Sequence, residues 1–300
     1  MKPLLIFNHK WRENLVVSQN SFTARMIALQ QMVERHNGSI IEVQDPVIWN
    51  SRWKRLIRPL TVLNSIVKEK PGVVIMQYPN YPFFWSLDRA RDVQRSIIFT
   101  KLLLSYCKNN RIPIIVDQRD IISASQVSFS KSLFEKFESS VYKNTDIVWT
   151  SSISFWDKYH LQYGFYKPKA RFVPNGCFMK NSFERKESFE DKVRFIYAGD
   201  LRPGDRGTEQ LIESLSKSKS KKCQFVLCGH NFEWLMKQTL DDRIQLLGEI
   251  DRSKVMQLYA ISHVGLIPHP YGGNYDIAFP TKLGEYVCSN LAVLSTDAGV

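Results

Sequence analysis

The first segment whose residue types could do chemistry is a loop rich in glycine and arginine in the second half of the chain. It runs from Gly199 to Gly207, carries Arg202 and Arg206, and follows a short apolar stretch. A helix capped by Thr208 is expected directly after it. Exposed backbone amides, the positive end of a helix dipole and fixed guanidinium groups together favour an anion such as a diphosphate. The loop therefore predicts a phosphate-binding site.

A second segment, at residues 280–287, places a lysine and a carboxylate on one predicted helix. Pro280 and Thr281 begin this helix, so its first amide groups have no partner within the helix and can bind a pyrophosphate beside Lys282. Glu285 lies one turn further on, where its carboxylate could accept hydrogen bonds from both hydroxyls of a ribose. The alternative is a capping carboxylate next to a lysine that faces solvent.

A third group of charged residues lies in the first half of the chain. Asp117, Arg119 and Asp120 directly follow the apolar run Ile114–Val116. Open α/β sheets bind ligands beyond the carboxyl ends of their parallel strands, which is where these side chains are expected. Salt bridges among the three charges, with a purely structural role, are the alternative.

The elements that must position these residues alternate between short apolar runs and longer segments with a helical repeat. The first helix begins at Ser21 and ends at Asn37-Gly38. Such alternation is typical of a parallel sheet covered by helices on both faces, and so of the α/β class. The expected strands span residues 4–7, 40–43, 73–77, 112–116, 147–150, 171–173, 193–198, 224–228, 244–247, 264–267 and 292–295. The other expected helices span residues 93–109, 128–143, 152–162, 231–239 and 252–261, and two more begin at Thr208 and Thr281.

Two domains are expected, joined by a polar linker. Residues 177–192 are rich in charged side chains and offer little to bury, as a linker does. The domains then span residues 1–176 and 193–300. A strand at 292–295 would be the last element, although such a strand needs a covering helix. We therefore expect that the second domain is unusually short or that the sequence is cut there.

Composition indicates an ordinary globular chain. Of the 300 residues, 44% are hydrophobic and 23% are charged. No apolar run approaches the ~18 residues that a membrane span needs, and the apolar run at the N-terminus is too short for a signal peptide. The five cysteines are odd in number and lack CxxC spacing, so reduced thiols are expected. These features predict a cytoplasmic protein.

The net charge of +12 is unevenly distributed. Residues 51–100 hold nine lysines and arginines against three acidic residues, and the densest part is Trp49–Arg58, where cations alternate with tryptophan and aliphatic side chains. Such a segment suits an anionic membrane surface or a phosphate-bearing partner. Nucleic acid is the competing partner for a basic patch, and a solvated face without a partner is the third reading.

The sequence lacks a P-loop, a nucleophile elbow, a zinc-protease helix and a Cys/His metal cluster. The order of its segments instead resembles the retaining glycosyltransferases of family 4, which have the GT-B fold. That family has a V-P-N-G turn, a glycine loop with a basic residue and a P-x-K-x-x-E-Y helix. They stand here as Val173–Gly176, Gly199–Gly207 and Pro280–Tyr286. The likeness covers residues 110–300 well, and residues 1–110 only by their strand and helix pattern.

The resemblance implies two Rossmann-like domains whose parallel sheets face a central cleft. It also implies transfer of a sugar from a UDP- or GDP-linked donor, with retention of configuration and without a metal or other cofactor. The acceptor would be a glycan or a lipid-linked molecule of surface-polysaccharide synthesis. The enzyme would be cytoplasmic and peripheral on the inner face of the membrane, with no nucleic-acid partner expected.

By residue, the resemblance implies that Glu285 binds the ribose and that Arg206 and Lys282 neutralise the diphosphate. The loop Asp117-Gln118-Arg119-Asp120 is similar to the D-x-R-D loop of polysaccharide enzymes, which assigns Arg119 and Asp120 to the catalytic site. The remaining donor ligands would be Gly199, Arg202, Gly207 and Thr281.

The sequence departs from the family pattern at three places. Asp200 stands where many members have an arginine, and the loop is one residue longer, so Arg202 is expected to substitute. Ile277 replaces the first of two acidic residues, and the nearby Asp276 is the candidate replacement. No glycine pair follows the first strand.

Two other functional classes remain open. A sugar epimerase or dehydrogenase of the Rossmann type should have G-x-G-x-x-G after the first strand, but Leu4–Asn20 contains no glycine. A non-catalytic sugar- or nucleic-acid-binding protein could have kept the fold. The retained Arg206, Lys282 and Glu285 argue against this second class.

Overall fold

The protein forms two compact units, divided in the main between Pro174 and Asn175. The computed structural model describes residues 2–8, 21–43, 62–78, 90–118, 131–157, 170–176, 192–272 and 275–297. Residues 177–191 of the expected linker lie outside the described residues. The basic segment Trp49–Arg58 does so too.

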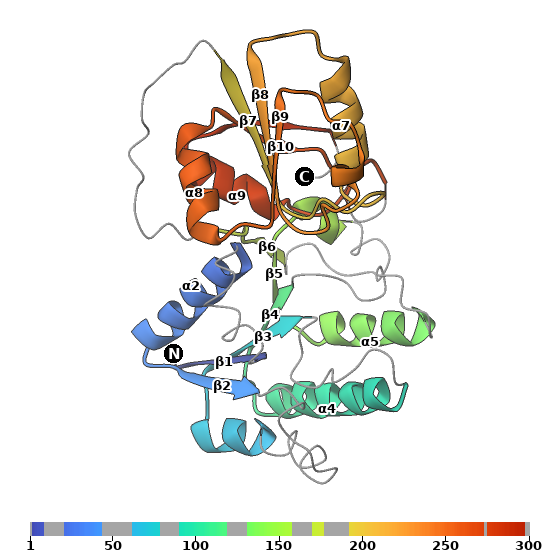
Figure 1. Cartoon of the computed structure of the whole chain (residues 1–300). Helices are drawn as coiled ribbons and strands as arrows, with labels where there is room; N and C mark the ends of the chain where they lie inside the picture. Colours follow the sequence, from blue (N-terminus) through green and yellow to red (C-terminus); the bar gives the residue numbers. More distant parts are fainter. Residues whose placement is uncertain are drawn as a thin grey trace, which may run out of the picture. The chain divides into compact units, whose positions relative to one another are not determined.

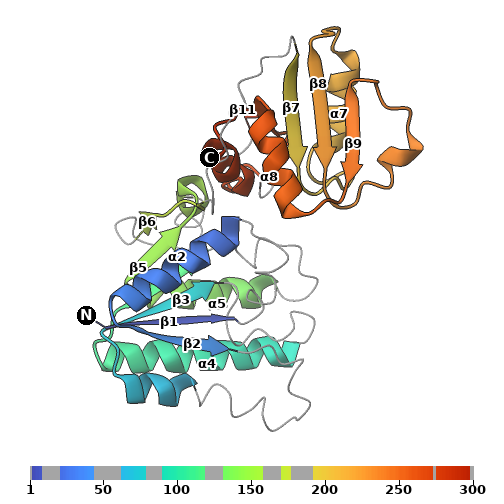
Figure 2. The same ribbon diagram turned by 60° about the vertical axis from the view of Figure 1, so that its left-hand side comes forward.

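The first unit is built on a six-stranded sheet in the order β2-β1-β3-β4-β5-β6, in which neighbouring strands run parallel (Figures 1 and 2). Its strands are β1 (Pro3–Asn8), β2 (Ser39–Val43), β3 (Val73–Tyr78), β4 (Ile114–Gln118), β5 (Ile147–Thr150) and β6 (Ala170–Phe172). Its helices are α2 (Ser21–Arg35), α4 (Ala90–Asn109) and α5 (Lys131–Lys143), with helical segments at 62–69 and 153–157. The helix at 62–69 was not expected from the sequence.

Successive side chains of the strands cover the two faces of this sheet. Leu4 and Met76 belong to the core cluster formed with α4, α5 and the 62–69 helix. Gln77 follows Met76 in β3, so its side chain points to the opposite face of the sheet. There it donates a hydrogen bond to the buried Met26 of α2. The helix α2 ends as expected, because Asn37 has a φ of 52° and the Gly38 amide donates to the Val33 carbonyl at 2.8 Å.

The strand expected at 112–116 is shifted by two residues, to Ile114–Gln118. It pairs with β3 and β5 as far as Gln118, so two polar residues that were expected to lie in a loop are buried in the sheet. Both find partners. Arg25 of α2 donates through Nε to Asp117 Oδ1 at 2.9 Å, and Gln118 donates to the Tyr142 hydroxyl at 2.7 Å.

The Arg25 guanidinium also donates to the carbonyl of Val173, in the turn after β6. Arg25, paired with the buried Asp117, therefore holds α2, β4 and this turn together. Asp117 forms this pair with α2, and the salt bridges expected within the 117–120 group stay a prediction. Arg119 and Asp120 lie outside the described residues.

The second unit has a five-stranded sheet in the order β11-β10-β7-β8-β9, and its neighbouring strands again run parallel. Its strands are β7 (Val193–Ala198), β8 (Cys223–Cys228), β9 (Ile244–Gly248), β10 (Val264–Ile267) and β11 (Ala292–Ser295). Its helices are α7 (Thr208–Lys217), α8 (Arg252–Ile261) and α9 (Thr281–Cys288), with the single turn η4 (Leu235–Lys237).

Helices cover both faces of this second sheet. Tyr197 and Leu227 lie in one core cluster with side chains of α7 and η4, whereas their neighbours Ile196 and Val226 lie in another with α8 and α9. Figure 1 accordingly shows α7 on one side of the strands and α8 and α9 on the other.

The helix expected at 231–239 is wrong, because only the three residues of η4 form a helical turn there. The apolar residues of this segment serve separate contacts. The Trp234 indole donates to the Leu201 carbonyl at 2.6 Å, Leu235 is fully buried, and Phe232 packs where Gly248 has no side chain. Their spacing therefore follows these contacts and not a helical face.

Among the described residues, no helix has the length and apolar character needed to cross a membrane. The described cysteines, which are Cys107, Cys223, Cys228 and Cys288, are free thiols.

Candidate functional site

The candidate site lies at the carboxyl edge of the second sheet. The chain moves from β7 to β8 and β9 on one side, and returns to β10 and β11 on the other. The loops after β7 and β10 therefore leave the sheet in opposite directions, which in open α/β sheets marks the place where ligands bind. The loop after β7 is Gly199–Gly207, and the segment after β10 leads to α9, so the two predicted phosphate-binding segments meet at this point.

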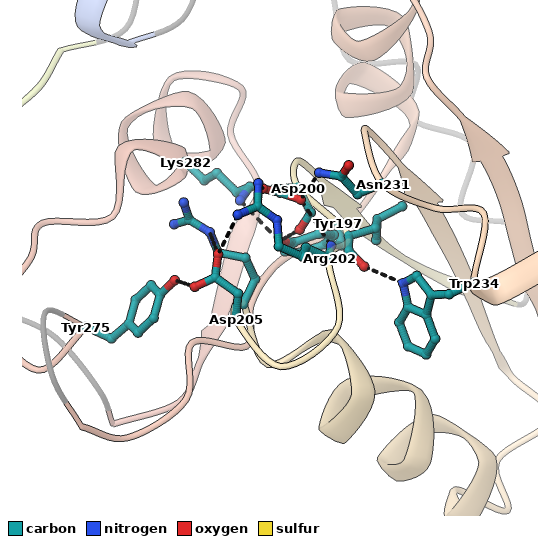
Figure 3. A network of polar contacts seen from close by, with 10 residues as sticks. Tyr197, Asp200, Arg202, Asp205, Asn231, Trp234, Tyr275 and Lys282 are labelled. Carbon is teal, nitrogen blue, oxygen red and sulfur yellow. Dashed lines mark hydrogen bonds and ion pairs between the residues drawn. The ribbon is translucent and has the colours of Figure 1, made fainter. Parts of the chain in front are cut away.

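Lys282, in the first turn of α9, is partly buried and packs against Tyr197, so it does not extend freely into solvent as the alternative expected. Its Nζ lies 4.5 Å from the ring centroid of Tyr197 and 3.4 Å from the Tyr197 hydroxyl (Figure 3). Gly199 makes this possible, because a Cβ there would lie 2.4 Å from Lys282 Cε. Burial, and then the nearby Arg206 guanidinium, lower the pKa of Lys282 from 10.5 to about 8.

Arg206 is the second cation of the site. Its Nε lies 3.5 Å from Asp205 Oδ2, and its guanidinium lies 5.5 Å from the centroid of the Tyr275 ring. The Nε is buried and makes no hydrogen bond within the described part of the chain. Two cations are thus held close enough to affect each other, with a buried donor still available, as expected of a site built for an anion.

Arg202 takes a different position from the one expected for a donor ligand. Its guanidinium Nη2 lies 3.0 Å from Asp200 Oδ2, and its side chain is 57% exposed. Asp200 also accepts hydrogen bonds from the Arg202 amide at 3.0 Å and from Asn231 at 2.9 Å, as Figure 3 shows in part. Arg202 therefore shapes the loop through Asp200, and its role as a donor ligand stays a prediction.

His269 and Tyr275 join the site, although sequence reasoning gave neither of them a role. Their rings lie 4.8 Å apart, and the Tyr275 hydroxyl donates to Asp205. Burial, followed by the charges of Lys282 and Arg206, lowers the pKa of His269 to about 4, so its imidazole is neutral at pH 7. Its buried Nδ1 has no hydrogen-bond partner among the residues that the structure describes. The sequence signal for His269 was its place two residues after the expected strand at 264–267.

The N-terminus of α7 differs in detail from the expectation. Gly207, with a φ of 74°, is the N-cap, whereas Thr208 is the first helical residue and is buried. A Cβ on Gly207 would lie 1.6 Å from the Pro268 carbonyl oxygen. Gly207 therefore lets the start of α7 pack directly against the segment that follows β10.

The N-terminus of α9 begins as predicted. Pro280 is its N-cap, without a side-chain cap, and Thr281 is its exposed first residue. Asp276 closes a turn by accepting a hydrogen bond from the Gly272 amide at 2.7 Å, next to the buried Ile277.

Glu285 neither caps a helix nor has an unoccupied carboxylate. It is 7% exposed, and its two oxygens lie 3.0 Å from the two Nη atoms of Arg252, in α8. Oε2 also accepts a hydrogen bond from the Tyr259 hydroxyl at 3.0 Å. Sequence reasoning missed both partners.

The described residues include no group of three or more His, Cys, Asp or Glu side chains that could hold a metal ion. What the site does present is two cations, a neutral imidazole and two helix N-termini around one edge of the sheet. This combination can bind a diphosphate and stabilise negative charge that grows on it. The buried, paired Glu285 lies on the helix that carries Lys282.

Comparisons with known proteins concern the family of the second unit and the fold. Residues 192–300, just over a third of the chain, match the family described as "Glycosyl transferases group 1". No curated protein matches the sequence.

Among solved structures, the chain is similar to HepE of Anabaena in complex with UDP, with a TM-score of 0.60, 14% identity, and coverage of 100% of this chain and 81% of that one. It is also similar to the apo form of the lipopolysaccharide outer core galactosyltransferase WaaB, with a TM-score of 0.57 and 13% identity. That match covers 88% of this chain and 67% of WaaB. A third similar structure is the catalytic domain of starch synthase IV from Arabidopsis thaliana bound to ADP and acarbose, with a TM-score of 0.52 and 13% identity. That match covers 80% of this chain and 60% of the starch synthase domain. At these identities the likeness concerns the fold. The chain has the GT-B fold of α/β glycosyltransferases, and the family match of residues 192–300 supports a glycosyltransferase.

Proposed function

We propose that this protein transfers a sugar, with retention of configuration, from a nucleoside diphosphate sugar to a glycan or lipid-linked acceptor of surface-polysaccharide synthesis. The observation that carries the proposal is the meeting of Arg206 and Lys282 at the carboxyl edge of the second sheet. Burial and the Arg206 charge lower the pKa of Lys282 to about 8, so holding both cations there is costly without an anion. A diphosphate would compensate that cost.

The reaction explains why two cations would be needed. As the bond between the sugar and the β-phosphate breaks, negative charge grows on the departing diphosphate. Fixed cations and helix amide groups stabilise that charge more than they stabilise the intact donor, so they lower the barrier. Arg206 and Lys282, aided by the starts of α7 and α9, are the groups proposed for this task.

The comparisons support the donor class of the proposal. One structurally similar protein was solved with UDP and another with ADP. Retention of configuration and the polysaccharide pathway rest on the resemblance of the ordered motifs to family 4. A peripheral position on the inner face of the cytoplasmic membrane, through Trp49–Arg58, belongs to the proposal as well, with no nucleic-acid partner.

The function is tested first with Arg206→Ala. We expect this variant to lower kcat at least ~100-fold, and to lower kcat more than it raises the donor KM, because Arg206 acts mainly on charge that grows in the transition state. The assay follows release of UDP or GDP from a panel of nucleotide sugars, and the anomeric configuration of the product is read by NMR. The control is Lys217→Ala, an exposed lysine of α7 that pairs with Glu213 at the surface. A rise in KM with unchanged kcat would contradict the proposed role, and nucleotide binding without turnover would identify a non-catalytic binding protein.

Turnover is expected to continue in EDTA, with kcat reduced by less than ~2-fold. The reason is that Arg206 and Lys282 already supply the positive charge that a bound cation would bring to the diphosphate. The measurement compares initial rates after exhaustive EDTA treatment with rates after adding manganese or magnesium. Complete loss of turnover that either ion restores would overturn the metal-independent mechanism.

A further inference from the structure

Charges of opposite sign alternate along the loop that follows β7. Arg202 lies between two carboxylates, with its Nη2 3.0 Å from Asp200 Oδ2 and its Nη1 3.9 Å from Asp205 Oδ2 (Figure 3). The same oxygen of Asp205 lies 3.5 Å from Arg206 Nε, so one carboxylate forms ion pairs with two guanidinium groups. The loop therefore places a negative charge directly beside the cation that is proposed to hold the diphosphate.

Tyr275 holds the Asp205 carboxylate in this place from the other segment of the site. Its hydroxyl donates a hydrogen bond to Oδ1 of Asp205, while Oδ2 faces the arginines. Burial, and then this hydrogen bond, raise the pKa of Tyr275 to about 12, so the hydroxyl keeps its proton near pH 7 and stays a donor. The Asp205 side chain is 34% exposed, so water and salt screen its charge only in part.

The donor and the product of the proposed reaction differ in the charge of their diphosphates. In a nucleotide sugar both phosphates are esterified or bridged, so each carries a single negative charge. The released nucleoside diphosphate carries about one more negative charge near pH 7.5, because a free terminal phosphate loses a second proton with a pKa of about 6. Fixed cations without an opposing charge would therefore hold the product more tightly than the donor, and slow product release limits the turnover of many enzymes.

We infer that Asp205 is a specificity-determining residue whose carboxylate disfavours the extra charge of the free nucleoside diphosphate and so promotes release of the product. The inference rests on the proposed function and deepens it. Asp205 and the diphosphate would share the Arg206 guanidinium, so the two anions repel each other at short range. This repulsion grows with the charge on the terminal phosphate, and it weakens binding of the product more than binding of the donor. Asp205 also opposes the charge that grows in the transition state, so Arg206 and Lys282 are both needed there. Tyr275 is the positioning residue that keeps the carboxylate beside Arg206.

The experiment isolates this charge by calorimetry at pH 7.5. It compares the Kd of UDP with that of its β-methyl ester, which has the charge of a nucleotide sugar but no sugar, and repeats the comparison with GDP. The measured quantity is the charge ratio, the Kd of the ester divided by the Kd of the free diphosphate. Asp205→Asn is expected to raise the charge ratio by ~5-fold or more, because losing the carboxylate helps the free diphosphate most. Asp205→Glu keeps the charge and is expected to stay within ~2-fold of the wild type. Both Kd values come from one variant, so a loss of folded protein does not hide the result.

Two further variants separate the possible failures. Glu213→Gln removes an exposed carboxylate of α7 that pairs with Lys217, and it is expected to keep the wild-type charge ratio. Tyr275→Phe keeps the ring beside Arg206 but loses the hydrogen bond to Asp205, so it is expected to raise the ratio by a smaller factor than Asp205→Asn. An unchanged ratio in this variant would overturn its positioning role.

The same measurements distinguish this inference from the proposed function. If Asp205→Asn changes both Kd values by the same factor, the carboxylate only shapes the loop, and its role in product release is wrong while the proposed function stands. An equal rise of the charge ratio in Glu213→Gln would show a general effect of net charge and would overturn the inference as well. If the wild type binds neither UDP nor GDP, the proposed function itself is wrong.

Discussion

Lys282→Met is expected to make the protein more stable and at the same time reduce its turnover by ~100-fold or more. The lysine carries its charge in a largely buried position beside Arg206, and both features oppose that charge. Methionine has similar length and packs on Tyr197 and Gly199 without a charge to desolvate. We expect a gain of about 1 kcal/mol or more in the free energy of unfolding at pH 7, hence a rise of about 2–4 °C in Tm.

The stability gain should depend on pH in a defined direction. The pKa of Lys282 falls from 10.5 to about 8 on folding. Below pH 8 both the folded and the unfolded protein hold the proton, so the full cost of the buried charge is present. Between pH 8 and about 10.5 the unfolded state binds more protons than the folded state, so the stability of the wild type rises with pH. The advantage of Lys282→Met should therefore be largest below pH 8 and shrink towards pH 10.5.

The affinity for a nucleotide should fall as the pH rises, the opposite of the wild-type stability, although both depend on the proton of Lys282. A diphosphate beside Lys282 favours the charged amine, so binding near pH 8 takes up a proton and the affinity for UDP or GDP falls as the pH rises through 8. Thermal unfolding across pH 6–10 and calorimetry in buffers of different ionisation enthalpy measure these effects. Lys254→Met, at an exposed position of α8, is the matched control. A lower Tm for Lys282→Met, or unchanged turnover, would refute the role of Lys282.

Much of the fold of the second unit could be predicted from its sequence. The strand at 193–198 and the helix at 252–261 have the expected bounds, because apolar periodicity and turn residues agree there. The prediction failed where tertiary contacts decide. Asp117 and Gln118 continue a strand because Arg25 and Tyr142 satisfy them, and one sequence does not show such distant partners.

The candidate site likewise contains residues that could be predicted from the sequence and residues that could not. Loops that present amides and cations to an anion leave a local signal, so the sequence could predict that Gly199, Arg206 and Lys282 belong to one candidate site, and the structure brings them together. The partners of Glu285 lie 26 and 33 residues away on another helix, and His269 is a lone histidine in an unremarkable context. Their importance comes from side chains that meet only after folding, which leaves no pattern along the chain.

Gly207 belongs to the predicted phosphate-binding loop, and it also allows α7 to pack against the segment after β10. Alanine at this position would adopt a φ of 74° and place its Cβ 1.6 Å from the Pro268 carbonyl oxygen, which would have to move by about 1.4 Å to reach 3.0 Å. That movement separates the start of α7 from the segment that carries His269. We expect Gly207→Ala to weaken binding of UDP or GDP by ~100-fold or more, because the phosphate-binding segments lose their contact.

Gly204→Ala provides a matched control within the same loop. Gly204 has almost the same φ, 73°, but a Cβ there would meet nothing within 4 Å. Both substitutions therefore carry the strain of a left-handed backbone, about 1–2 kcal/mol for a residue with a side chain, and only Gly207→Ala adds the clash. Urea unfolding is expected to show a cost at least ~2 kcal/mol larger for Gly207→Ala than for Gly204→Ala. Equal costs and equal nucleotide affinities would show that Gly207 is needed only for its backbone conformation. The contact between α7 and the segment after β10 would then not hold the site together.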